Sequence, residues 1–97
     1  MTKNQALLRA KRSQILQIAS RYGVKHLRVF GSVARGTDDQ QSDIDFLVEL
    51  APDRSLLDLG GFLYEVRSLL GTEVDVVTEK GLRPRIRERV LAEAVDL

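Results

Sequence analysis

Residues 31–46 read GSVARGTDDQQSDIDF, a stretch that joins a glycine turn to a strand beginning with two acids. Asp43 and Asp45 are separated by one residue, so in a strand their side chains lie on the same face. Two carboxylates this close repel each other unless a positive group lies between them. The stretch therefore raises the question of which cation or ligand these acids bind.

The composition describes an ordinary globular chain. Its 97 residues are enough for one compact domain, expected to cover residues 1–97, with one modest core. The absence of cysteine excludes disulfide scaffolds and cysteine zinc sites, and the single His26 argues against a histidine-rich metal site. No apolar run is long enough to span a membrane, and the N-terminus is too polar for a signal peptide. We therefore expect a cytoplasmic protein without membrane association.

Charge is segregated along the chain. Residues 1–37 carry eight basic side chains and no acid, whereas residues 38–79 carry eleven acids and only two arginines. This asymmetry indicates a basic surface for an anion or phosphate beside an acidic region for a cation. The alternative is that both blocks form solvated faces that pair with each other on folding.

The hydrophobic pattern predicts helices alternating with short strands. Asn4 is expected to cap the first helix, which ends near Tyr22, and Ser55 with Asp58 forms a predicted capping box. The apolar face of the second strand is expected to hold Ile44, Phe46, Val48 and Leu50. The expected helices are 4–22, 56–70 and 84–95, the expected strands are 26–30, 43–50 and 73–77, and residues 32–35 are expected to form one helical turn.

These elements predict an α+β fold, in which a small mixed β-sheet is covered by helices. In the last helix, Ile86, Val90, Leu91 and Ala94 are expected to face inward. The pair Gly60-Gly61 is a weak point of the second long helix, because each glycine costs about 1 kcal/mol relative to alanine. It indicates a bend, close packing or a break there.

A third acid, Asp75, lies in the apolar strand 73–77 and needs a partner, because burying a bare charge is costly. If the second and third strands are neighbours, Asp75 converges with Asp43 and Asp45. Three carboxylates are hard oxygen ligands that suit Mg²⁺ or Mn²⁺, which share their coordination with substrate phosphates. The pattern therefore points to phosphoryl or nucleotidyl transfer.

The turn before the acids provides the complementary half of such a site. Gly31 and Gly36 let the backbone approach a ligand closely, and Ser32 offers a hydroxyl beside free backbone N–H groups. Arg35 is a candidate contact to the same phosphates, although an exposed structural arginine is an equal alternative. No Gly-Lys-Ser/Thr follows, so the turn is not a Walker loop.

Gly31-Ser32, ten intervening residues and Asp43-Ile44-Asp45 resemble the GSx10DxD signature of the DNA polymerase β-like nucleotidyltransferases. The longer string GSVARG…SDIDFLVE is similar to the minimal nucleotidyltransferase branch of that superfamily. The resemblance implies a polymerase β-like nucleotidyltransferase fold with ATP as substrate. It also implies that Gly31 and Ser32 hold the β- and γ-phosphates.

By the same resemblance, Asp43 and Asp45 bind two Mg²⁺ ions, with Mn²⁺ as an alternative, and Asp75 binds metal on the acceptor side. Asp75 also helps to remove the proton of the acceptor hydroxyl. Members of this branch pair with a HEPN-type ribonuclease toxin and act as its antitoxin. The implied reaction moves AMP from ATP to a tyrosine of that partner.

Two other functions remain open at this point. One is a nucleotide-binding module that neutralises its partner by docking alone. The other is nucleotidyl transfer to RNA or to a small molecule, for which the basic first helix is the only support. That helix lacks interleaved aromatics, which favours a solvated face over nucleic acid binding. Apolar helix faces also leave self-association open.

Overall fold

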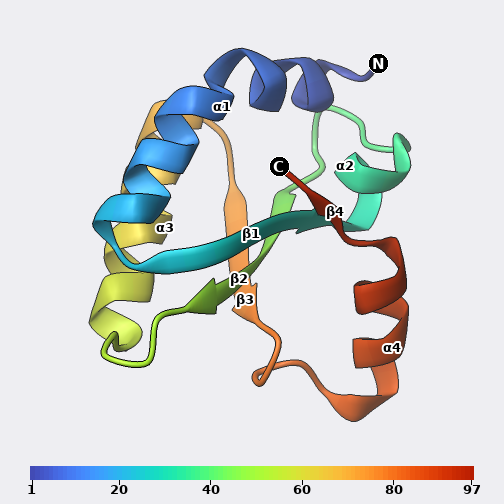
Figure 1. The fold of residues 1–97 in the computed structure, drawn as a ribbon. Helices are drawn as coiled ribbons and strands as arrows, with labels where there is room; N and C mark the ends of the chain where they lie inside the picture. The colour runs from blue at the N-terminus through green and yellow to red at the C-terminus, as the bar shows by residue number, and fades with distance from the viewer.

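The computed structural model describes residues 1–97 and contains four helices and four strands (Figure 1). Phe30 leads directly from a strand into a helix of five residues, so the predicted helical turn is present. No helix has the length and apolar character needed to cross a membrane. In chain order the elements are α1 (Lys3–Arg21), β1 (Val24–Phe30), α2 (Gly31–Arg35), β2 (Ile44–Leu50), α3 (Leu56–Leu70), β3 (Val74–Thr78), α4 (Pro84–Glu93) and β4 (Val95–Asp96).

The four strands form one mixed sheet in the order β3-β2-β1-β4. β2 pairs with β1 in an antiparallel ladder and with β3 in a parallel one, while β4 is an antiparallel edge strand on β1. α3 is the crossover that a parallel β2–β3 pair requires. This arrangement confirms the predicted α+β fold with a small mixed sheet and flanking helices.

The core lies between α1, α3 and one face of the sheet. The predicted apolar face of β2 is confirmed for Ile44, Phe46 and Val48, which are all at most 1% exposed. Phe46 meets Phe62 of α3 edge to face, with 6.2 Å between ring centroids and 76° between ring planes. Figure 1 shows α1 and α3 side by side, with α4 set apart from them.

The helix starts were predicted with mixed success. Ser55 and Asp58 form the expected capping box of α3. The cap of α1 is Thr2 and not Asn4, because the Thr2 hydroxyl accepts from the Gln5 N–H while the Gln5 side chain accepts from Thr2 N–H. A reciprocal pair satisfies two free N–H groups at once and so places the start two residues earlier.

The prediction for α4 was correct in part on its inward face, where Leu91 and Ala94 are partly buried, and wrong on its end. Of the four residues expected to face inward, only Val90 is buried, and Ile86 is 43% exposed. The helix ends at Glu93, since Ala94 is already extended and leads into β4. Val90 and Leu47 of β2 are the two buried residues outside the main core cluster. With so little apolar burial, α4 depends on polar contacts for its position.

Gly60 and Gly61 lie inside an unbroken α3, and only one of them is required by packing. A Cβ on Gly61 would overlap the ring of Tyr22, the residue that caps the end of α1 and whose hydroxyl is hydrogen-bonded to Glu65. A Cβ on Gly60 would have no atom within 4 Å. Of the bend, close packing and break considered for this pair, close packing is therefore observed at Gly61.

The two glycines provide a matched pair of substitutions. Gly61→Ala is expected to destabilise the fold by about 1–3 kcal/mol, because the methyl group displaces a ring held by a hydrogen bond. Gly60→Ala is expected to stabilise it by up to about 1 kcal/mol through helix propensity alone. Urea unfolding of both variants measures the difference, and equal effects of the two changes would contradict this packing.

Candidate active site

The turn between β1 and α2 brings backbone close to an acid. Gly31 has a φ of 74°, a conformation that favours glycine, and it begins α2 directly after the strand. A Cβ at this position would overlap the Asp45 Oδ2 atom. Ser32 follows as the second residue of α2 and is half-buried. Gly31 is thus the residue that permits α2 to start against the carboxylate of Asp45.

Strand pairing brings the predicted acids together. Asp45 lies opposite Phe30 in the β1–β2 ladder and opposite Asp75 in the β2–β3 ladder. Asp43 precedes the first residue of β2 by one position. Asp43 and Asp75 are exposed, whereas Asp45 is half-buried between the neighbouring strands. The condition that β2 and β3 be neighbours is therefore met.

The electrostatics of the cluster centre on Asp45. Burial, followed by the carboxylates of Asp75 and Asp43, raises the pKa of the Asp45 carboxyl to about 6. The nearby Arg35 guanidinium opposes this rise, and Glu93 adds to it. The cluster is thus short of positive charge, which is the condition under which a carboxylate site binds a cation.

The donor set fits a divalent cation that retains ligands from elsewhere. Carboxylate oxygens are hard ligands, and Mg²⁺ typically takes one or two of them together with water and substrate phosphate. No group of three acidic or histidine side chains is placed so that it could hold a metal ion by itself. The three aspartates therefore match a metal that arrives with a nucleotide better than a permanently held ion.

Arg35 is engaged by a residue that the sequence analysis did not single out. Its Nη1 atom donates to both carboxylate oxygens of Glu93, at 3.1 Å to Oε1 and 3.0 Å to Oε2. Glu93 Oε1 also accepts from the Gly31 N–H at 3.0 Å. Although burial raises the pKa of the Glu93 carboxyl, these bonds more than offset it and hold the pKa below its ordinary value. Arg35 therefore has the structural role that was considered as the alternative to phosphate binding.

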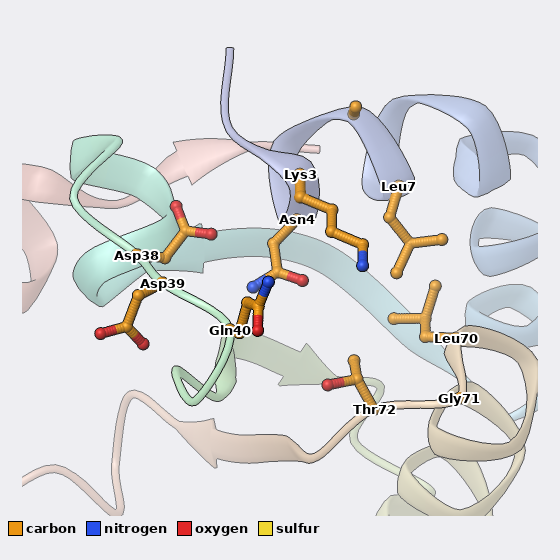
Figure 2. Close-up of a pocket in the computed structure, with 10 residues that line it drawn as sticks. Lys3, Asn4, Leu7, Asp38, Asp39, Gln40, Leu70, Gly71 and Thr72 are labelled. Carbon is orange, nitrogen blue, oxygen red and sulfur yellow. The ribbon is translucent and has the colours of Figure 1, made fainter.

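A hollow of about 890 Å³ lies apart from this cluster (Figure 2). Figure 2 shows Lys3 and Leu7 of α1, Asp38 and Asp39 of the loop after α2, and Thr72 just before β3 around it. Neither this hollow nor a smaller one of about 230 Å³ is lined by Asp43, Asp45 or Asp75. The acids therefore lie outside these two hollows.

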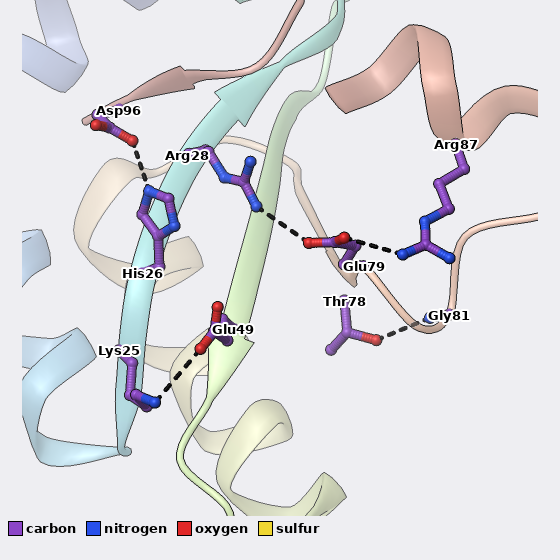
Figure 3. A network of polar contacts seen from close by, with 9 residues as sticks. All are labelled: Lys25, His26, Arg28, Glu49, Thr78, Glu79, Gly81, Arg87 and Asp96. Atoms are coloured by element: carbon purple, nitrogen blue, oxygen red, sulfur yellow. Dashed lines mark hydrogen bonds and ion pairs between the residues drawn. The ribbon is translucent and has the colours of Figure 1, made fainter. Parts of the chain in front are cut away.

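The remaining polar contacts on β1 are structural (Figure 3). His26 bonds to Asp96 of β4 at 2.6 Å and so joins the edge strand to β1. Glu79 joins Arg28 of β1 to Arg87 of α4, at 3.5 Å and 3.0 Å. The ion pair of Glu79 with Arg87 holds the first half of α4, and the Glu93 contacts hold its last residue.

A family model described as the nucleotidyltransferase domain matches residues 12–97. The chain belongs to the nucleotidyltransferase family. It is 45% identical to "Putative protein adenylyltransferase MJ0435" of Methanocaldococcus jannaschii, over 87% of this chain and 90% of that protein. It is 37% identical to the protein adenylyltransferase MntA of Thermococcus cleftensis, over 81% and 80% of the two chains. The chain is thus a nucleotidyltransferase whose relatives carry names of protein-modifying enzymes.

Solved structures agree with the family assignment. A structure described as "putative minimal nucleotidyltransferase" shares 46% identity and a TM-score of 0.86, over 96% of this chain and 95% of that one. A toxin-antitoxin crystal structure with AMP-PNP has a TM-score of 0.72 at 21% identity, over 87% and 69% of the two chains, and supports the fold alone. The fold of this nucleotidyltransferase is therefore the minimal form expected from the string GSVARG…SDIDFLVE.

The raised pKa of Asp45 predicts that this residue lowers the stability of the metal-free protein, and that the effect depends on pH. Between pH 3.8 and about 6 the folded chain binds more protons at Asp45 than the unfolded chain, so its contribution to stability is lost as pH rises through that window. In EDTA at pH 8, Asp45→Asn should stabilise the nucleotidyltransferase by about 1–2 kcal/mol, allowing about 1.36 kcal/mol per pKa unit and a reduction for solvent screening. The gain should disappear below about pH 4.

Thermal unfolding across this pH range measures the effect, with a shift of about 4–8 °C expected per kcal/mol for a chain of this size. Asp53→Asn is the matched control, because Asp53 is an exposed acid in the turn after β2. Two results would contradict this prediction: a stabilisation by Asp45→Asn that does not change with pH, or no stabilisation at pH 8. Either would show that the ionised Asp45 carboxylate does not lower the stability of the folded protein.

Proposed function

We propose that this nucleotidyltransferase moves AMP from ATP to a hydroxyl group of a partner protein and so inactivates a toxin. The main support is that Asp45 and Asp75 lie opposite each other on neighbouring strands, beside the Gly31 turn. The names of the relatives supply the reaction class, because two of them at 45% and 37% identity are called protein adenylyltransferases. Their names support a protein acceptor for this chain.

The openness of the acid cluster also favours a protein acceptor. Asp43 and Asp75 are exposed, and the larger hollows lie elsewhere. Small substrates are usually held in concave pockets that bury most of their surface. A side-chain hydroxyl presented by a folded partner needs no such pocket, because the partner itself provides the binding surface.

In the proposed mechanism, Gly31 and Ser32 bind the β- and γ-phosphates, and Arg35 adds a charge beside them. Asp43, Asp45 and Asp75 would hold two divalent ions, Mg²⁺ or Mn²⁺, which supply charge neutralisation at the attacking and leaving oxygens. The acceptor oxygen forms a bond to the α-phosphorus while the bond from that phosphorus to the β-phosphate oxygen breaks. Pyrophosphate leaves, and Asp75 takes up the hydroxyl proton.

The proposed partner is a HEPN-type ribonuclease toxin, and the proposed acceptor is one of its tyrosines. Both follow from the resemblance of residues 31–49 to the minimal nucleotidyltransferase branch. Residues 1–97 are proposed to act as a single domain, since all four strands belong to one sheet flanked by the helices. The toxin itself would complete the site.

Incubation with labelled ATP, Mg²⁺ and the toxin-like protein encoded beside this gene tests the reaction. Label is expected to move to a tyrosine of that protein, and mass spectrometry should find an added AMP. Asp75→Asn is expected to lower the rate roughly 100-fold or more, because a group that takes up the transferred proton is lost. Asp53→Asn serves as the control, since its side chain lies in an exposed turn.

No labelling of the partner by the wild-type chain, alongside an active relative as positive control, would refute adenylyl transfer to it. The double variant Asp43→Asn/Asp45→Asn separates transfer from docking. Full neutralisation of the toxin by this variant at normal expression would show that binding alone is the mechanism.

A further inference from the structure

Glu93 connects α4 to both ends of α2. Its carboxylate accepts from the N–H of Gly31, the first residue of α2, at 3.0 Å. The same carboxylate accepts from the guanidinium of Arg35, the last residue of α2, at 3.0 and 3.1 Å. One side chain on another helix therefore bonds the start and the end of the five-residue helix that carries the glycine turn.

α2 needs such support because it is too short to be stable on its own. Isolated helices below about 12 residues are marginal in water, since nucleation is costly. The cap residue Phe30 makes no side-chain hydrogen bond to the first turn. The side chain of Val33 is buried and holds the middle of α2, but it does not fix the direction of the Gly31 amide. Glu93 supplies that acceptor.

Gly31 is thereby held between two carboxylates. On one side its N–H bonds to Glu93, and on the other its Cα packs so closely against Asp45 that no Cβ fits. A loss of the Glu93 bond would free the peptide between Phe30 and Gly31 to rotate. Such a rotation would change the distance between the proposed phosphate-binding turn and the acid cluster.

We propose that Glu93 is a positioning residue of the nucleotidyltransferase site, which fixes the Gly31 turn and Arg35 relative to Asp45. This inference rests on the proposed function for the identity of the ligand, ATP, but the contact itself does not depend on it. The Glu93 side chain is only 19% exposed, and the Arg35 side chain remains 46% exposed while it is paired with Glu93. Arg35 can therefore keep its bond to Glu93 while it faces a phosphate.

The opposite role is that the Glu93 carboxylate stands in for phosphate on the same donors and competes with it. The two roles predict opposite changes in ATP affinity when Glu93 is replaced. Removal of a competitor strengthens ATP binding, whereas removal of a positioning group weakens it. Binding of ATP with Mg²⁺ to variants of the full chain, measured by calorimetry, therefore decides between them.

Glu93→Ala is expected to weaken ATP binding roughly tenfold to 100-fold, the range associated with displacements of about 1 Å in a preorganised site. Glu93→Gln retains an oxygen acceptor for the Gly31 N–H and should recover a large part of that loss. Glu88→Ala is the matched control, because Glu88 is an exposed acid of the same helix that takes no part in the ion pairs of Arg87 and Glu93. Its ATP affinity should equal that of the wild type.

Amide hydrogen exchange without nucleotide provides the readout that is independent of function. In Glu93→Ala the Gly31 amide should exchange roughly tenfold faster, while the Phe46 amide in the core is unchanged. Unchanged exchange at Gly31, unchanged or tighter ATP binding, or an equal loss in Glu88→Ala would overturn the proposal. If the wild-type chain binds no ATP, the proposed function fails, and the exchange result alone then decides whether Glu93 holds the turn.

Discussion

The packing of Gly31 against the carboxylate of Asp45 is the constraint on which the site depends. Antiparallel pairing sets Phe30 opposite Asp45, so β1 must turn into α2 beside an acid. Only a residue without Cβ and with a positive φ can make that turn. The parallel partner β3 then adds Asp75 from the other side. Three separate segments meet at one point because one strand, β2, pairs with both neighbours.

This convergence has an electrostatic cost that the fold itself only partly offsets. Asp45 carries a pKa of about 6 because burial and the carboxylates of Asp75 and Asp43 disfavour its charge. Arg35 is the nearby cation, yet it is shared with Glu93. A site that destabilises its own protein is typical of function, since ligand binding recovers the cost. The arrangement is thus consistent with a nucleotidyltransferase that gains its cations with the nucleotide.

The fold class and the acids of the cluster were predictable from local patterns, whereas their convergence required that β2 and β3 be neighbours. Alternation in β2 identified Phe46 as core and placed Asp45 on the opposite face, and the spacing from Gly31 identified the family. Glu93 was not predictable, since it lies 62 residues from Gly31 and follows no periodic pattern on a helix with one buried residue. β4 was missed for a similar reason. Its two residues pair with β1 only after the whole sheet has formed.

The central claim is that metal and nucleotide bind where Gly31, Asp45 and Asp75 meet. Paramagnetic broadening of amide resonances by Mn²⁺ with a non-hydrolysable ATP analogue measures the location directly. The account predicts that the amides of these three residues broaden most at low Mn²⁺. Strongest broadening at Lys3, Asp39 and Thr72, around the hollow of about 890 Å³, would contradict it.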